Sequence, residues 1–493
     1  MKGHDHIIAL DIGTTSTKGL LHSIGRGNIA TYAREYKTYF PGPGMAEQDP
    51  EEVLDAVVEV VKELVHLNSV DPARVLALVF GGILHSLLPV DRSGTCMTRA
   101  MIWSDMRARE QCTRLREQLD LADVHRRTGC SIHPLYLAPR LLWLREKAPH
   151  IFNEATRFIS IKEYVLHRLF GEYVVDRSIA SGTGLLNSLN LDWDRDLLLS
   201  AGITRDRLSE VVDTDHRLTL KGNLAERMGL RAGTAGIIGG SDGPLAHLGS
   251  VGTDPSRMSL TIGTSAALRK AVPKPTIIPG TEAWCYYLTE NTWVLGGVVH
   301  DAGNLFQWFS DRFLQEDSGE GVFDILERSQ RELQPGAEGL FFLPFMSGER
   351  SPFYNPFASA AMIGMTFSHG REHIIRAMAE GISYRIYSVY KTLNPELQAD
   401  LVLTGGILRS PAWMQITADF LGKRLYRAEH SYASAWGAAL IAMRALGIID
   451  SMERINEMLR PVPAVEFDPD SHDAYRRVLA GYEQYYRELF HKS

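Results

Sequence analysis

The stretch Leu10-Asp-Ile-Gly-Thr-Thr15 decides the fold, because a close copy of it, Leu260-Thr-Ile-Gly-Thr-Ser265, recurs in the second half of the chain. Apolar residues precede both copies, so each predicts a buried strand that runs into a glycine turn. An internal repeat of this kind indicates duplicated half-domains.

Outward from the first copy, Asp49 and Pro50 predict the start of a helix, with Glu52 placed to complete a capping box. Two further strands are predicted before glycine turns, at 235–238 and 401–403. Strands that alternate with helices define an α/β class, in which ligands gather where strand ends meet helix starts. A turn-rich segment at 249–256 separates the repeats. It predicts two domains, 1–249 and 250–493.

Length and composition are those of a two-domain globular protein: 493 residues, 45% apolar and 23% charged. A net charge of -7 argues against nucleic-acid and anionic-membrane partners. Four scattered cysteines indicate neither a zinc site nor a disulfide framework, and no apolar run is long enough to span a bilayer. We expect a cytoplasmic protein that acts on a small molecule.

The first loop carries groups suited to a phosphate. Glycine lets the backbone approach an anion, hydroxyl groups add donors and lysine adds charge; these residues are Gly13, Thr14, Thr15, Ser16 and Lys18. Asp11 would lie badly beside phosphate without a divalent cation between them, so it is the predicted Mg²⁺ ligand. The second loop offers Gly263 and Thr264 but has Thr261 in place of Asp11. A plain hairpin turn is the alternative for a single copy.

Paired D-x-G-T-T and T-x-G-T-S loops, with G-G-S-D-G at 239–243 between them, resemble the FGGY carbohydrate kinases over nearly the whole chain. The resemblance implies a duplicated actin-like (ribonuclease-H-type) fold whose two lobes close over ATP and a polyol. It also implies that Gly303, Gln307, Gly406 and Ser410 lie at the nucleotide site, although Ser410 can equally cap the helix that begins at Pro411. The roles of Glu349 and Arg350 in S-G-E-R-S-P stay open.

Asp242 is the predicted catalytic base, since phosphoryl transfer needs a carboxylate that accepts the hydroxyl proton and the family places its base here. The neighbouring glycines leave room for a sugar beside it. A turn that merely caps the next helix is the alternative.

The closest resemblance is to the gluconate kinase branch, through strings such as M-A-E-Q-D-P (45–50) and I-K-E-Y (161–164). It implies ATP-dependent phosphorylation of gluconate at the 6-hydroxyl, with Mg²⁺. A bound carboxylate needs a cation, for which His85, Arg140 and Lys162 are the candidates. Leu84, Trp103 and Asp105 are further predicted substrate contacts. Xylulose or another polyol is the alternative acceptor, and a non-catalytic actin-like sensor is the alternative class.

The last segment repeats Tyr475, Leu479, Tyr482 and Tyr486 at helical spacing. This pattern predicts an amphipathic helix that packs on its own domain. A homodimer contact through it is the alternative that the pattern leaves open.

Overall fold

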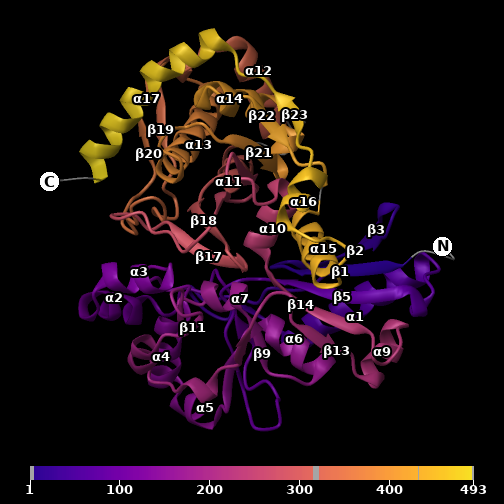
Figure 1. Ribbon diagram of the computed structural model, residues 1–493. Coiled ribbons are helices and arrows are strands. Elements are labelled where there is room, and N and C mark those ends of the chain that lie inside the picture. The colour runs from indigo at the N-terminus through magenta and orange to yellow at the C-terminus, as the bar shows by residue number, and fades with distance from the viewer. Residues whose placement is uncertain (1–4, 315–320, 431, 491–493) are drawn as a thin grey trace.

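The computed structural model describes residues 5–314, 321–430 and 432–490, and these form two lobes, each built on one twisted sheet (Figure 1). The first sheet has the strand order β13-β14-β5-β1-β2-β3 and the second the order β17-β18-β16-β15-β21-β22-β23. In both, the strand before the repeated loop pairs antiparallel with the next strand and parallel with a later one. The sequence repeat is therefore also a repeat of topology.

The strands of the first half are β1 (His6–Ile12), β2 (Ser16–Ser23), β3 (Gly27–Glu35), β4 (Glu47–Gln48), β5 (Val75–Gly82), β6 (Leu88–Val90), β7 (Ala100–Met101), β8 (Arg157–Ile159), β9 (Val174–Asp176), β10 (Leu186–Asn187), β11 (Asp192–Trp193), β12 (Glu210–Val212), β13 (Arg217–Thr219) and β14 (Ala235–Ser241). Its helices are α1 (Pro50–Leu67), α2 (Arg109–Gln118), α3 (Leu121–Thr128), α4 (Leu137–Lys147), α5 (Pro149–Glu154), α6 (Ile161–Phe170), α7 (Arg177–Gly182), α8 (Arg195–Ala201), α9 (Gly222–Met228) and α10 (Asp242–Val251).

The strands of the second half are β15 (Arg257–Ile262), β16 (Ala266–Val272), β17 (Trp284–Thr289), β18 (Thr292–Val299), β19 (Phe341–Leu343), β20 (Ala361–Ile363), β21 (Asp400–Thr404), β22 (Leu425–Arg427) and β23 (Val462–Val465). Its helices are α11 (Gly303–Phe313), α12 (Val322–Glu332), α13 (Arg371–Leu393), α14 (Pro411–Leu421), α15 (Ala433–Ala445), α16 (Met452–Met458) and α17 (Pro469–Phe490).

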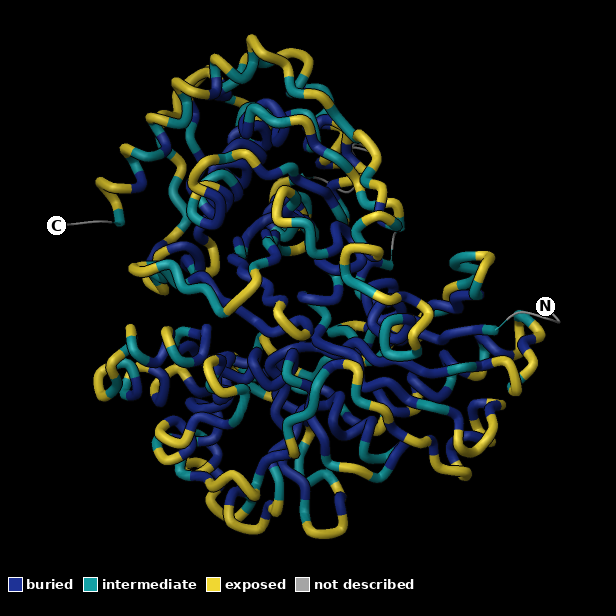
Figure 2. Tube along the Cα trace, in the orientation of Figure 1, coloured by how far each residue is buried: buried dark blue, intermediate teal, exposed yellow. Residues whose placement is uncertain are grey.

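Helix α1 begins where the sequence predicts, with Asp49 as its N-cap accepting a hydrogen bond from the Glu51 amide at 2.9 Å. The predicted capping box is wrong, because the Glu52 carboxylate accepts a hydrogen bond from the Tyr39 hydroxyl at 2.5 Å instead. The apolar stripe of α1 is buried against the first sheet. Buried residues likewise fill the interior of each lobe in Figure 2.

Two helices cross at the junction of the lobes, and each packs on the sheet of the other lobe. Helix α10 follows the first sheet but also packs on strands of the second, whereas α15 follows the second sheet and packs on β1, β5 and β14 of the first. At their crossing, a Cβ on Gly249 would lie 2.0 Å from the Ala433 carbonyl oxygen, and one on Gly437 would lie 2.0 Å from that of Leu245. Only glycine permits this approach, so the crossing joins the two lobes at backbone contact.

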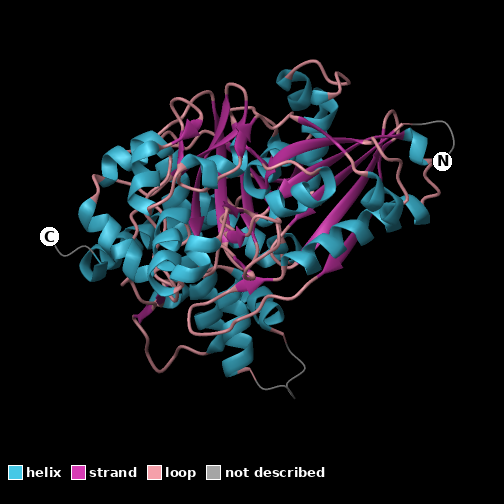
Figure 3. Ribbon diagram, turned by 90° about the horizontal axis from the view of Figure 1, so that it is seen from below, coloured by secondary structure: helices cyan, strands magenta, loops and turns pink. Residues whose placement is uncertain are grey.

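Helix α17 lies along the outside of the second lobe (Figure 1), and helices flank the sheets on both faces (Figure 3). Tyr475, Tyr482 and Tyr486 of α17 are buried, as the predicted amphipathic pattern requires. Within the described ranges, no helix combines the length and the apolar character that crossing a membrane requires.

Candidate active site

The first repeated loop is a tight turn between β1 and β2. The Gly13 amide donates to the Ser16 carbonyl oxygen at 3.0 Å, and the Tyr36 hydroxyl donates to the Gly13 carbonyl oxygen at 2.6 Å. Trp103, predicted as a substrate contact, donates from Nε1 to Thr14 Oγ1 at 3.0 Å. Its half-exposed ring therefore lies against this loop, beside the exposed side chains of Thr15 and Lys18.

The second repeated loop lies against the start of α11. The Gly303 amide donates to the Gly263 carbonyl oxygen at 2.9 Å, and a Cβ on Gly303 would lie only 2.4 Å from that oxygen. Thr264 is exposed at the loop tip, so its hydroxyl is open to a ligand. Gln307, one turn into α11, is exposed and donates to Asp311 at 2.6 Å.

A third glycine turn follows β21. Gly405 has a φ of +93°, and a Cβ there would lie 2.4 Å from the Ile262 carbonyl oxygen at the end of β15. Gly406 comes next and brings this turn beside the second loop. Ser410 is buried and caps α14 by accepting a hydrogen bond from the Trp413 amide at 3.3 Å. The helix-capping interpretation of Ser410 is therefore confirmed.

Asp11 near the end of β1 and Asp242 just after β14 lie on either side of β5, the strand between β1 and β14 in the first sheet. Asp11 on β1 and Gly240 on β14 both pair with Gly81, on opposite sides of β5, and Asp242 begins α10 two residues later. Strand spacing puts the two outer backbones about 10 Å apart. Gly81 between them has no side chain, and a Cβ there would lie 3.1 Å from Leu245 Cδ1 and 3.7 Å from the Asp11 Cα. The charge of Asp242 acts on Asp11 and raises its pKa. Both carboxylates thus border the same space.

The surroundings of Asp11 suit a divalent cation. Its Oδ1 is buried and has no hydrogen-bond partner among the described residues. Burial, and next the charge of Asp242, raises the pKa of Asp11 to about 7. No cluster of three or more potential metal-ligating side chains occurs in the described part of the chain. A Mg²⁺ ion held by one or two carboxylates, with phosphates and water completing its shell, fits this donor set.

Asp11→Asn should stabilise the ligand-free protein most at neutral and alkaline pH. The Asp11 pKa of about 7 lies above the value of about 3.9 in an unfolded chain. The folded state therefore holds an extra proton between these pH values, and its stability falls as the pH rises from about 4 to 7. Asparagine removes this loss. In a chelator, the gain in Tm should grow from about pH 5 to pH 7 and then stay level; a gain independent of pH contradicts it.

A buried polar network holds the end of β14, the strand that precedes Asp242. Lys162 Nζ donates to Asp176 Oδ2 at 2.7 Å and to the Gly240 carbonyl oxygen at 3.0 Å. Ser178 Oγ hydrogen-bonds Ser241 Oγ at 2.7 Å. Lys162 is thus a buried partner of Asp176 that holds the end of β14, and its role as a substrate contact stays a prediction. Its charge is already paired inside the lobe.

Arg269, which sequence reasoning missed, reaches the junction from the second lobe. Its Nη1 donates to Thr261 Oγ1 at 3.0 Å, and its Nε is buried without a hydrogen-bond partner among the described residues. Burial raises the pKa of Asp242, and the nearby Arg269 charge counteracts this rise. Arg269 therefore offers a donor and a positive charge beside the predicted base. An arginine in a strand gives no local sequence signal for such a role.

His85 lies beside the junction of the two lobes, close to Asp242. The backbone amide of Leu84 is near enough to the Asp242 carboxylate to counteract the rise in its pKa, and His85 follows with a φ of +62°. Its Nδ1 donates to the Gly182 carbonyl oxygen at 2.7 Å. Burial, and next the charges of Arg350 and Arg140, lowers the His85 pKa well below its usual value. The neutral ring therefore presents Nε2 as a hydrogen-bond acceptor.

Arg140 and Asp105 are engaged inside the first lobe. All three guanidinium nitrogens of Arg140 donate to backbone carbonyl oxygens, including that of Ile102 at 2.6 Å. The fully buried Asp105 carboxylate accepts hydrogen bonds from Arg107 and from the Ala46 amide at 2.8 Å. Their hydrogen-bonding groups are engaged within the fold, and their substrate roles stay predictions.

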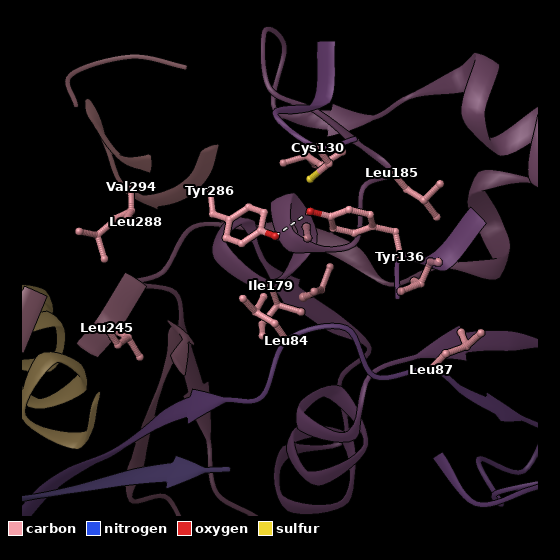
Figure 4. Close-up of a cluster of buried hydrophobic side chains, with 14 of the residues drawn as sticks. Leu84, Leu87, Cys130, Tyr136, Ile179, Leu185, Leu245, Tyr286, Leu288 and Val294 are labelled. Atoms are coloured by element: carbon pink, nitrogen blue, oxygen red, sulfur yellow. Dashed lines mark hydrogen bonds between the residues drawn. The ribbon is translucent and has the colours of Figure 1, made fainter. Parts of the chain in front are cut away.

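Two tyrosines from different lobes meet beside His85, a contact that no local sequence pattern could indicate. The hydroxyl groups of Tyr136 and Tyr286 are 2.9 Å apart, and Figure 4 shows them above Leu84 and Ile179. The His85 ring lies 5.2 Å from the Tyr136 ring and 6.0 Å from that of Tyr286, measured between centroids. Leu84, the residue before His85, is a buried apolar side chain on the same side of the tyrosine pair as Ile179 (Figure 4).

Two lobes of repeated topology, with a glycine loop in each and a carboxylate pair at their junction, define an actin-like kinase of small molecules. The chain belongs to the FGGY family of carbohydrate kinases: the model of the family's N-terminal domain matches residues 6–249, and that of its C-terminal domain matches 258–446. It is therefore a carbohydrate kinase.

Among particular relatives, the gluconokinase of Bacillus subtilis is 33% identical over 96% of this chain and 94% of its own. The xylulose kinase of Lactococcus lactis is 28% identical over 98% of this chain and 95% of its own. The crystal structure of a gluconate kinase from Lactobacillus acidophilus superposes with a TM-score of 0.92 at 28% identity, covering 99% of this chain and 98% of that one.

Proposed function

We propose that this carbohydrate kinase transfers the γ-phosphate of ATP to a sugar acid, D-gluconate, to give 6-phosphogluconate. The observation that carries the proposal is the position of Asp242, which lies at the lobe junction close enough to Asp11 to raise its pKa and close to the Leu84-His85 segment. The likeness to gluconokinases at 33% identity supports the choice of acceptor.

In the proposed reaction, the 6-hydroxyl oxygen attacks the γ-phosphorus while the bond to the bridging oxygen of ADP breaks. Asp242 accepts the hydroxyl proton, so its carboxylate must be ionised when the sugar binds. The loops at Gly13 and Gly263 hold phosphate oxygens through backbone and hydroxyl donors. Mg²⁺ at Asp11 would neutralise phosphate charge. Lobe closure would exclude water that competes for the phosphate.

A panel of acceptors tests this proposal. With ATP and Mg²⁺, release of ADP in a coupled assay should be fastest for D-gluconate, with a kcat/KM at least about tenfold above that for D-xylulose, glycerol or D-glucitol. Mass spectrometry should find one added phosphate on the gluconate. Preference for xylulose would replace the acceptor but keep the kinase, and binding of both ligands without product would indicate a sensor.

The xylulose alternative has its own support. Xylulose kinases at 26–28% identity span nearly the whole chain, and one from Lactobacillus acidophilus superposes with a TM-score of 0.92. A neutral His85 would suit a neutral sugar as well as the hydroxyl groups of an acid. Gluconate is a six-carbon acid with a carboxylate at C1, whereas xylulose is a neutral five-carbon ketose, so the acceptor panel separates the two alternatives.

A further inference from the structure

Arg269 lies on β16, the strand that follows the second repeated loop, and its side chain faces α10. In the antiparallel register Arg269 is opposite Ser259 of β15, so the two side chains share one face of the sheet. Ser259 faces α10, because its hydroxyl oxygen is 3.0 Å from Nδ1 of His247 in that helix. Arg269 therefore lies between the sheet of the second lobe and the helix that begins with Asp242.

One end of the Arg269 guanidinium is fixed by a threonine. Its Nη1 donates to Thr261 Oγ1 at 3.0 Å, and Thr261 Oγ1 also accepts a hydrogen bond from Thr404 Oγ1 at 2.9 Å. Thr261 stands at the repeat position that Asp11 occupies in the first lobe. Where the first repeat has a carboxylate suited to a cation, the second repeat has a hydroxyl that orients a cationic side chain.

The other edge of the guanidinium is turned toward the start of α10. A Cβ on Gly243 would lie 3.4 Å from Arg269 Nε and 3.7 Å from Arg269 Nη2. Gly243 directly follows Asp242 and has no side chain that could cover this edge. Arg269 and the predicted base are thus neighbours at the junction of the lobes.

This edge of Arg269 has no partner in the described part of the chain. Nε is buried without a hydrogen-bond acceptor, and Nη1 is the guanidinium nitrogen that the fold engages. A buried donor without a partner costs about 1–3 kcal/mol, so such a donor at a ligand site indicates an acceptor that the ligand supplies. The N–H groups of Nε and Nη2 are parallel, a geometry that matches two oxygens of a phosphate or a carboxylate.

Two anions can reach this edge, the phosphoryl group that is transferred and the carboxylate of a sugar acid. The attacking hydroxyl must lie within hydrogen-bond reach of Asp242, with the γ-phosphorus about 3–3.5 Å from that hydroxyl. The carboxylate of gluconate is at C1, at the opposite end of the carbon chain from the 6-hydroxyl. The anion beside Asp242 and Gly243 is therefore the phosphoryl group.

We propose that Arg269 binds the phosphoryl group during its transfer and stabilises the negative charge on its oxygens. The inference rests on the proposed function, because it needs Asp242 as the base, and it adds a catalytic residue that the second lobe supplies. While the bond from phosphorus to the bridging oxygen of ADP breaks and the bond to the acceptor oxygen forms, Nε and Nη2 hold two phosphoryl oxygens. A donor pair fixed in advance acts on the transition state more than on substrate binding.

Loss of this donor pair should lower kcat and leave substrate binding nearly unchanged. In Arg269→Gln, kcat should fall about 10²–10³-fold, the cost of removing one preorganised donor, while KM for gluconate and for ATP should each change less than about threefold. The acceptor used is the one that the panel selects, with gluconate expected.

Calorimetry gives a readout that does not depend on turnover. With the acceptor and Mg²⁺ present, ADP together with aluminium fluoride imitates the planar phosphoryl group, and it should bind Arg269→Gln at least about tenfold more weakly than the parent. ADP alone should bind both proteins equally. A role of Arg269 in structure alone would not separate these two ligands.

Thr261→Val tests the anchor and leaves the charge in place. Valine has the shape of threonine but accepts no hydrogen bond from Nη1, so kcat should fall about tenfold, the value of one hydrogen bond to a charged group. In the double variant with Arg269→Gln, the two losses should not add, because both remove the same interaction.

Lys270→Gln is the matched control. Lys270 is the next residue on β16, so its side chain lies on the opposite face of the sheet, and its Nζ already donates to Asn394 Oδ1 at 3.0 Å. Its replacement should change kcat less than about threefold. The Tm of each variant reports folding, and if Arg269→Gln is unfolded, the effects of Arg269→Lys on kcat and KM decide, because lysine keeps the charge but loses the parallel donors.

Two kinds of failure are distinguishable. A parent protein that phosphorylates no acceptor of the panel, or an Asp242→Asn protein that turns over at the parental rate, overturns the proposed function and the inference with it. An active parent whose Arg269 variants keep kcat, or lose only affinity for the acceptor, overturns the inference alone.

Discussion

Asp242→Asn should reduce kcat by about 10³-fold or more while the protein still binds ATP. General-base catalysis contributes about 10²–10⁴-fold, and an amide cannot accept the hydroxyl proton. Asparagine has the same shape and can keep the hydrogen bond that the Asp242 carboxylate accepts from the Gly243 amide at 2.7 Å, so the start of α10 should remain intact. Single-turnover phosphorylation of gluconate measures the loss.

Nucleotide binding by calorimetry and Tm separate loss of the base from loss of structure. Asp213→Asn is a matched control, because Asp213 is a half-buried carboxylate that already has a partner, Arg177, at 2.5 Å. It should change kcat less than about threefold. An Asp242→Asn protein that turns over at the parental rate would show that another group accepts the proton.

Gly437→Ala should destabilise the protein by more than about 4 kcal/mol, a loss reserved for severe steric or burial errors. The added methyl carbon would lie 2.0 Å from the Leu245 carbonyl oxygen and 2.8 Å from its carbonyl carbon, and backbone atoms cannot move aside as a flexible side chain can. The helices would have to separate, and the packing of α15 on the first sheet would separate with them.

Chemical denaturation followed by circular dichroism measures this effect. Gly222→Ala is the matched control: a Cβ at Gly222 meets only the Ala232 methyl group, at an ordinary 3.7 Å. It should shift the midpoint little or raise it, since alanine lowers the entropy of the unfolded chain. An unchanged midpoint in Gly437→Ala would mean that the crossing is not the tight contact described.

The fold was predictable because its signals are local. A strand that ends in a glycine turn, repeated once, reports the duplication in a few residues, and Asp49-Pro50 marks the start of α1 at the exact residue. The capping box failed since Glu52 has a competing partner, Tyr39, that comes from another segment.

The candidate site was predictable only in part. Asp11 and Asp242 stand beside recognisable glycine turns, whereas the partners of a charged side chain come from distant segments. Lys162, Arg140 and Asp105 looked available in the sequence, but each is satisfied inside the fold. The tyrosine pair, Tyr136 and Tyr286, becomes visible only when the two lobes are placed together.

Helices α10 and α15, each of which packs on the sheet of the other lobe, link the movement of the lobes to the position of the base. Asp242 is the first residue of α10, which starts at a strand end of the first lobe and packs on the sheet of the second. Rotation of one lobe against the other must therefore turn the helix that carries the base. We expect sugar binding to bring Asp242 into its reactive position through the rotation of this helix. In the open molecule the base is not yet in position, so ATP is not hydrolysed by water.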